Sequence, residues 1–193
     1  CGLEYPFTSG TNVVYQPRIW NGRIRFAEPT TFVSTNAGAH NGDFARGVMY
    51  DLIWLSDATM MPAQALELEL TANTHDVDVY FRRGTHAGFE GSAAGWELLA
   101  SATGVVSAGG GALTSIPFTG QVNASAGEVI SFYVVTSVDN GIQIDASGVT
   151  GGTFAADSNL GVLVGTSVAA EFGGAVAPAS LRARHGYQLC VVP

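Results

Sequence analysis

The stretch QALELELTANTHDVDVYFR, Gln64 to Arg82, decides the fold class because apolar and polar residues alternate along it. Two runs each keep one apolar face: Leu66, Leu68 and Leu70, and then Val77, Val79 and Phe81. A period of two residues is typical of strands with one buried face. The five-residue link TANTH between the runs predicts that they form a β-hairpin.

The rest of the chain shows the same strand pattern, and no segment has an apolar period of 3.6 residues over three turns. Further strands are expected at Val13–Ile19, Gly22–Ala27, Thr31–Ser34, Gly47–Trp54, Trp96–Thr103, Leu113–Phe118, Val129–Ser137, Gly141–Ala146, Leu160–Gly165 and Ala179–Cys190. Glycine-, Asn- and Ser-rich segments such as SAGGG and VDNG separate them. We therefore predict an all-β protein, a two-sheet β-sandwich or jelly-roll-like domain. Its predicted core contains the six apolar residues above together with Ile130, Phe132 and Val134.

Four carboxylates would share one face of the predicted hairpin. Symmetric pairing about TANTH sets Glu69 near Asp76 and Glu67 near Asp78. Like charges that face each other destabilise a sheet, so we expect a counter-charge. Arginine is the favoured answer, because GRIRF and LRARH each place two arginines on one face: Arg23 with Arg25, and Arg182 with Arg184. A calcium ion held by Glu67, Glu69, Asp76 and Asp78 is the alternative, and independent solvated charges are a third reading.

The composition excludes some classes of partner. Only 12% of residues are charged, all eight basic residues are arginine, and the net charge is −8. A nucleic acid or an anionic membrane surface would need a clustered basic surface, so neither is expected as a partner. No apolar run reaches the length of about 18 residues that a membrane helix needs.

The two cysteines, Cys1 and Cys190, lie at opposite ends of the chain. Their placement favours a disulfide formed in an oxidising compartment, either within one chain or between chains. Two unrelated free thiols are the alternative. An N-terminal Cys-Gly is also what lipoprotein processing leaves, so lipidation of Cys1 is a further reading.

No motif in the sequence predicts catalysis. The histidines His40, His75, His86 and His185 lack the spacing of a metal site. Ser167 in GTSVA lacks the second glycine of a nucleophile elbow. The glycine-rich SAGGG segment has no lysine to accompany it in a phosphate loop. We predict a protein without enzymatic activity, catalytic residues, a metal site or a cofactor, with calcium as the one exception above.

The beginning of the chain repeats its end. Residues 4–26, EYPFTSGTNVVYQPRIWNGRIRF, correspond to residues 170–189, AEFGGAVAPASLRARHGYQL, when the prolines are aligned. The aligned pairs are Pro17 with Pro178, Trp20 with Leu181, Arg23 with Arg184 and Phe26 with Tyr187. The sequence therefore divides into residues 1–27, a copy of the closing strands, and residues 28–193, a sandwich module.

Residues 31–188 resemble a repeated β-rich module of bacterial secreted and cell-surface proteins. The resemblance rests on HNGDFARGVMYDL (40–52), THDVDVYFRRGTHAGFEGSAAGWELLASATG (74–104), SIPFTGQVNASAGEVISFYVVTS (115–137) and FAADSNL (154–160). The closing motif of that module, SYPF…PRxWNGxIxY, is well formed at residues 4–26 and degenerate at residues 170–189. The resemblance implies an extracellular structural or display module of no known catalytic activity.

These observations predict a structural subunit, located outside the cell or at its surface, that self-assembles into a filament, sheath or surface layer. Its N-terminal segment would give strands to a neighbouring copy. The residues expected to make this contact are Tyr5, Phe7, Pro17, Trp20, Arg23, Arg25 and Phe26. The alternative is a monomeric secreted module for glycan binding or adhesion, in which the same segment covers an edge of its own sandwich.

Overall fold

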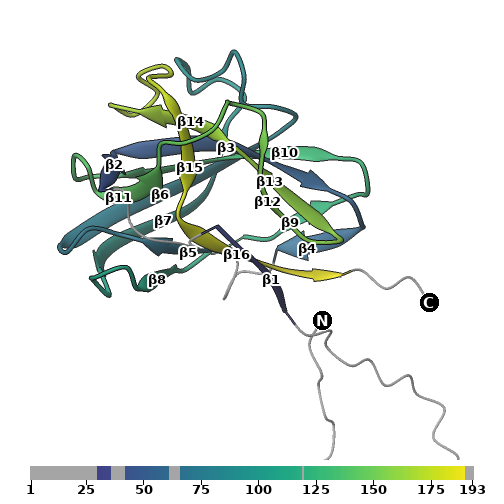
Figure 1. The fold of residues 1–193 in the computed structure, drawn as a ribbon, viewed down its shortest axis with the longest axis horizontal. Coiled ribbons are helices and arrows are strands. Elements are labelled where there is room, and N and C mark those ends of the chain that lie inside the picture. Colours follow the sequence, from purple (N-terminus) through teal and green to yellow (C-terminus); the bar gives the residue numbers. More distant parts are fainter. Residues whose placement is uncertain (1–29, 36–41, 61–65, 119, 190–193) are drawn as a thin grey trace, which may run out of the picture.

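The computed structural model describes residues 30–35, 42–60, 66–118 and 120–189. These residues form sixteen β-strands in two sheets that pack face to face (Figure 1), so the predicted all-β sandwich is confirmed. None of the described residues lies in a helix, and none therefore forms an apolar helix of membrane-spanning length.

The larger sheet has ten strands, and every strand-to-strand pairing in it is antiparallel. Its strands are β2 (Asp43–Ala45), β3 (Gly47–Trp54), β6 (Thr74–Arg83), β7 (Glu97–Val106), β10 (Val129–Thr136), β11 (Ile142–Asp145), β12 (Thr153–Ala156), β13 (Leu160–Leu163), β14 (Gly165–Val168) and β15 (Pro178–Leu181). The order along the sheet is β2-β11-β15-β14-β3-β10-β6-β7. Strand β13 also pairs with β3, and β12 pairs with β13. Among its longest strands, β6 shows the alternation of apolar and polar residues that is visible in the sequence, whereas β3 and β10 are buried along almost their whole length.

The smaller sheet has six strands, again paired antiparallel. They are β1 (Thr31–Ser34), β4 (Ala58–Met60), β5 (Leu66–Glu69), β8 (Leu113–Ile116), β9 (Val122–Ala124) and β16 (Ala183–Leu189). Strand β16 is its central member, because it pairs with β5, β4 and β1. The strands expected at Val13–Ile19 and Gly22–Ala27 lie outside the described residues.

The interior between the sheets contains the predicted core. Eight of the nine predicted residues are buried: Leu66, Leu68, Leu70, Val77, Val79, Ile130, Phe132 and Val134. Phe81 is partly buried and packs against the same cluster. Trp54 and Tyr187 add an edge-to-face pair, with 5.7 Å between the ring centroids. Alternation in the sequence thus identified the inward face of each strand correctly.

The predicted hairpin between residues 66–70 and 75–82 is wrong. Strand β5 belongs to the smaller sheet, where it pairs with β8 and β16, whereas β6 belongs to the larger sheet, where it pairs with β7 and β10. The link between β5 and β6 therefore crosses from one layer to the other. Both strands turn an apolar face to the same interior, so their alternation is the same as that of a hairpin. The His75 side chain, which is buried, holds the crossing through a hydrogen bond of 2.9 Å to the Thr71 carbonyl oxygen.

A second crossing lies near the end of the chain, where one continuous strand was expected over Ala179–Cys190. Strand β15 lies in the larger sheet and β16 in the smaller one, with Arg182 between them (Figure 1). Thr35 secures this bend: its Oγ1 donates to the Leu181 carbonyl oxygen (2.5 Å) and accepts from the Ala183 amide (3.0 Å). The last strands of the chain therefore join the two layers.

Replacing Leu68 by Ala tests the position of the core. Leu68 is fully buried, so the smaller side chain should leave a cavity and lower the free energy of unfolding by about 2–5 kcal/mol in a denaturant titration. Leu55 is 53% exposed, and its replacement by Ala is the control, expected within about 0.5 kcal/mol of the parent. A loss below about 1 kcal/mol for Leu68→Ala would contradict the assigned face of β5.

Candidate functional site

A buried ion pair joins the second crossing to the smaller sheet. Arg182 Nε lies 3.1 Å from Glu69 Oε2, and Arg182 Nη2 lies 3.4 Å from Glu69 Oε1, so the guanidinium group binds the carboxylate through two nitrogens. Arg182 is 2% exposed and Glu69 is 1% exposed, so Glu69 is buried although it was expected on the outward face of the hairpin. The Glu69 amide also donates to the Arg182 carbonyl oxygen at 2.9 Å. Side chains and backbone therefore fix the same register.

A second ion pair lies two residues along on each strand. Arg184 Nε donates to Glu67 Oε2, and the Arg184 side chain is 38% exposed. The Arg184 guanidinium carbon also lies 4.5 Å from the centre of the Phe32 ring, in cation–π contact. The hydrogen bond to Glu67 raises the pKa of Arg184. For Glu67 and Glu69, arginine is the counter-charge, as expected, and it comes from LRARH.

Asp76 and Asp78 lie elsewhere, on β6 in the larger sheet. Val77 and Val79 face the interior, so Asp76 and Asp78 lie on the outer face of the larger sheet. Glu67 lies on the outer face of the smaller sheet, on the opposite side of the sandwich. Asp76 Oδ1 accepts a hydrogen bond from the Gly104 amide at 2.9 Å. The shared face of four carboxylates, and with it the calcium site proposed for them, is therefore wrong. Across the described part of the chain, no three His, Cys, Asp or Glu side chains gather to hold a metal ion.

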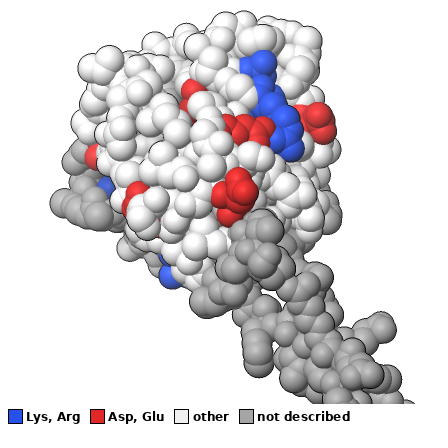
Figure 2. Space-filling view, turned by 90° about the vertical axis from the view of Figure 1, so that its right-hand side faces the viewer, with Lys and Arg blue, Asp and Glu red and all other residues white. Residues whose placement is uncertain are grey.

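Most of the described arginines form ion pairs with carboxylates. Figure 2 shows a largely uncharged face on which the main group of arginine atoms lies beside acidic residues. Two further pairs are Arg46 with Asp139 and Arg83 with Glu128. The remaining described arginine, Arg82, stacks over the Phe89 ring at 3.5 Å from its centre. The described module therefore presents acidic rather than basic surface to a partner.

The C-terminal copy of the repeated motif forms β15 and β16, the last two strands of its own module. We call the place that these two strands take in the two sheets the closing position. Strand β15 has a neighbour on each edge, β11 and β14. Residues Arg184 and His185 of β16 pair with β5 on one edge and with β1 on the other. The residues expected to mediate assembly (Tyr5, Phe7, Pro17, Trp20, Arg23, Arg25 and Phe26) and the expected disulfide, Cys1 with Cys190, lie outside the described residues.

A buried polar cluster surrounds Asp51 on β3. Its carboxylate accepts hydrogen bonds from Thr85 Oγ1 (2.6 Å), from the His86 amide (3.0 Å) and from Ser131 Oγ (2.7 Å), and His86 Nδ1 lies 2.7 Å away. Burial alone would raise the pKa of Asp51, but the hydrogen bonds from His86, Thr85 and Ser131 and the charge of His86 outweigh it and lower the pKa to about 2. Asp51 thereby fixes the start of the β6–β7 loop on the sheet.

This cluster has the residue types of a catalytic triad but another geometry. Nucleophilic catalysis needs a chain in which the serine hydroxyl meets the histidine and the histidine meets the carboxylate. Here Ser131 Oγ and His86 Nδ1 both bind the same Asp51 oxygen, and the buried His86 Nε2 has no hydrogen-bond partner. The arrangement therefore anchors a loop and does not activate Ser131.

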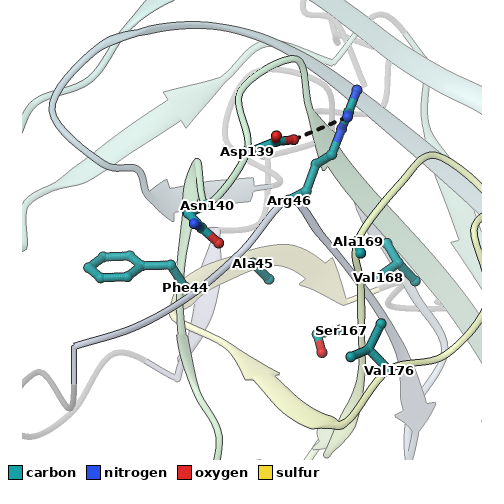
Figure 3. A pocket seen from close by; sticks show the side chains of 9 residues that line it. All are labelled: Phe44, Ala45, Arg46, Asp139, Asn140, Ser167, Val168, Ala169 and Val176. Carbon is teal, nitrogen blue, oxygen red and sulfur yellow. Dashed lines mark hydrogen bonds and ion pairs between the residues drawn. The ribbon is translucent and has the colours of Figure 1, made fainter.

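A surface pocket of about 370 Å³ lies at the end of the larger sheet that β2 forms. Its lining comes from β2, the β10–β11 turn, β14 and the β14–β15 loop: Phe44, Ala45, Arg46, Asp139, Asn140, Ser167, Val168, Ala169 and Val176. Figure 3 shows Phe44 and Val176 on opposite sides, with Ala45 and Ser167 between them. Arg46 Nη1 and Asp139 Oδ1 lie 3.2 Å apart on a further side.

The walls of the pocket are held from behind by aromatic packing. Phe172, in the β14–β15 loop, has a φ of 48° and packs its ring edge-on against both Tyr80 and Tyr133, with centroid distances of 5.2 and 5.1 Å. The two tyrosine rings stack on each other at 5.7 Å. Tyr80 Oη donates to Glu171 Oε1 at 2.7 Å. A left-handed backbone is unfavourable for a non-glycine residue, so packing has to stabilise it. The loop that carries Ala169 and Val176 is thereby positioned on the sheet.

The pocket was missed in the sequence because its residues come from separate segments. VDNG was interpreted as a turn, which it is, with Asn140 at a φ of 56°. Nothing in the sequence placed that turn against Phe44 or Val176, since β2 and β14 were not expected as strands. The sequence carried no signal for the site, because it shows neither the exposure of Phe44 nor the position of β2 at the edge of the sheet.

No family model and no curated protein matches this chain.

The contrast between the two ion pairs can be tested. Arg182→Met should leave the Glu69 carboxylate buried without its cation and lower the free energy of unfolding by about 3–5 kcal/mol. Arg184→Met, the matched control on the same strand, should cost about 1 kcal/mol or less because the pair is partly solvated. The double variant Arg182→Met/Glu69→Leu should regain most of the loss. Equal effects of the two single variants in urea titrations would contradict the assignment.

His185 gives a prediction about pH. It is fully buried, with Nε2 3.1 Å from Tyr50 Oη, and burial lowers its pKa from 6.5 to about 4. Between pH 6.5 and about 4, His185 is protonated in the unfolded chain and neutral in the folded chain. The free energy of unfolding therefore falls as the pH drops towards 4. The loss attributable to this group is roughly 3 kcal/mol. In His185→Gln the decrease in unfolding free energy between pH 7 and 4.5 should be smaller by about that amount; an unchanged decrease would contradict the assignment.

Proposed function

We propose that this protein is an extracellular structural subunit that assembles with copies of itself into a filament, sheath or surface layer. In this proposal residues 4–26 of one copy add strands to a neighbouring copy. The extracellular location rests on the resemblance to bacterial secreted and cell-surface modules. The self-association rests on what the structure shows about the repeated motif.

The observation that carries the proposal is the occupied closing position. Residues 178–189 fill this position in their own module: β15 has β11 and β14 as neighbours, and β16 pairs with β5, β1 and β4. The better-formed copy, residues 4–26, therefore finds no vacant closing position in the same module. If it forms strands, they have to pair at another edge, in the same copy or in another.

Replacement of the C-terminal copy by the N-terminal one would be unfavourable. In the proline alignment Asn21 takes the place of Arg182, and Trp20 takes the place of Leu181. Leu181 is 1% exposed, which leaves no room for an indole without rearrangement, and Glu69 would lose its cation. A buried carboxylate without its partner costs about 3–5 kcal/mol. Addition to an open edge supports the proposal better than exchange at this position.

Open edges are present in the described part of the module. There, β7 pairs only with β6, β2 only with β11, and β1 only with β16. Strand addition to such an edge gives affinity through backbone hydrogen bonds. The segment is also suited by charge, because residues 4–26 carry Arg18, Arg23 and Arg25 against Glu4 alone, whereas the described module is acidic.

The place where the described chain begins also suits an outward contact. Thr31 pairs with Tyr187, so the first and the last described residues lie at the same end of the module. If residues 4–26 are extended, they span roughly 80 Å, against a diameter of roughly 40 Å for a domain of this size. The segment is thus long enough to reach a second copy.

Deletion of residues 1–27 tests the proposal. The full-length protein should exceed its monomer mass of 20.0 kDa in light scattering and form polymers in electron microscopy. The deletion variant should remain folded, with an unchanged melting temperature, and should be monomeric. A peptide of residues 1–27 should then block assembly of the full-length protein.

Charge reversals supply the matched control. Arg23→Glu/Arg25→Glu changes two residues on one face of an extended segment and should weaken assembly. Arg18→Glu changes the other expected strand, Val13–Ile19, outside the pair of arginines on one face, and should have the smaller effect per charge. A full-length protein that stays at 20.0 kDa, or a deletion variant that unfolds, would instead support the monomeric module for glycan binding or adhesion.

A further inference from the structure

The pocket beside β2 combines two kinds of wall. Phe44 and Val176 are large apolar residues that are 42% and 64% exposed, although most side chains of this type are buried in the core. Arg46, Asp139 and Asn140 supply polar groups on the adjoining side (Figure 3). An exposed apolar surface beside convergent polar groups is typical of a ligand site rather than of ordinary surface.

The polar wall offers both donors and acceptors and has no net charge. Arg46 and Asp139 form an ion pair with 3.2 Å between Nη1 and Oδ1, so their charges cancel. The Arg46 side chain is 33% exposed, so part of its guanidinium group can donate to a ligand. The Asn140 amide can both donate and accept. A phosphate or carboxylate ligand would meet Asp139, and a cationic one would meet Arg46.

We propose that this pocket binds an uncharged saccharide. A pyranose ring has one face of C–H groups and an edge of hydroxyl groups, which donate and accept hydrogen bonds at once. The C–H face would pack against the Phe44 ring, and neighbouring hydroxyls would bind Arg46, Asp139 and Asn140. The volume of about 370 Å³ falls in the range of small-molecule sites and accommodates roughly one or two sugar units. The proposal does not rest on self-assembly: of the nine described lining residues only Val176 lies within residues 170–189, the C-terminal copy of the repeated motif, and none lies within residues 4–26.

The site can be altered without harm to the fold. Asp139 is 81% exposed at its side chain and lies in a turn, and Phe44 is 42% exposed. Their replacement by Ala should therefore change stability little. Val149 is 76% exposed and does not line the pocket, so Val149→Ala is a matched control for the removal of an exposed apolar side chain.

Saturation-transfer difference NMR on the full chain tests the proposal, because it works for monomers and assemblies alike. The probes are cellotetraose, maltotetraose, mannotetraose and chitotetraose, each at about 10 mM, which is tenfold above a weak dissociation constant of about 1 mM. At least one should receive magnetisation at its C–H protons. Phe44→Ala and Asp139→Ala should each weaken binding about tenfold, and Val149→Ala should leave it unchanged.

Four outcomes would overturn the proposal. The first is that none of the four sugars receives magnetisation, and the second is that Phe44→Ala and Asp139→Ala leave the affinity unchanged. The third is that a tetragalacturonate binds more tightly than every neutral sugar. The fourth is that an uncharged tetrapeptide binds in the pocket and the sugars do not. Each of these results is independent of whether deletion of residues 1–27 abolishes assembly.

Discussion

The buried contact between Arg182 and Glu69 is the constraint on which the rest of the structure depends. It lies where the chain passes from the larger sheet to the smaller one, and both side chains are almost fully removed from solvent. The loss of hydration offsets much of the attraction in such a pair, so its role is to specify a register more than to add stability. A one-residue slip of β16 along β5 would separate the two buried charges and would turn Tyr187 away from the core.

With that register fixed, the remaining features of the module follow. Thr35 attaches β1 to the bend, His185 meets Tyr50 across the interior, and Tyr187 packs on Trp54. The closing position is then full, and Thr31, near the beginning of the described residues, lies beside Tyr187 of β16. The proposal that residues 4–26 add to another edge rests on this occupied position. The pocket at β2 lies at one end of the larger sheet, with the β14–β15 loop as one wall.

The sequence predicted what depends on local alternation and failed where the pairing is non-local. It identified the inward faces of β5, β6 and β10, and it named LRARH as a source of counter-charges for Glu67 and Glu69. It could not tell a hairpin from a crossing between layers, because Leu68 and Val79 face the same interior in both cases. It placed Glu69 on the outward face of a hairpin shared with Asp76 and Asp78 and could not indicate that Glu69 is buried, because period two marks the face of a strand but not what covers that face. The sequence could not predict the pocket, since Phe44, Asp139 and Val176 come from separate segments that meet only in the folded protein.

The central claim is that residues 178–189 hold the closing position of their own module permanently. Amide hydrogen exchange of the full-length protein, followed by mass spectrometry, measures this most directly, because exchange reports the free energy with which each strand opens. We expect peptides from β15 and β16 to be as strongly protected as those from β3 and β10, in dilute samples and in assembled ones alike. Rapid exchange of residues 178–189 in the assembled state, with β3 and β10 still protected, would show that another segment had displaced them and would contradict the claim.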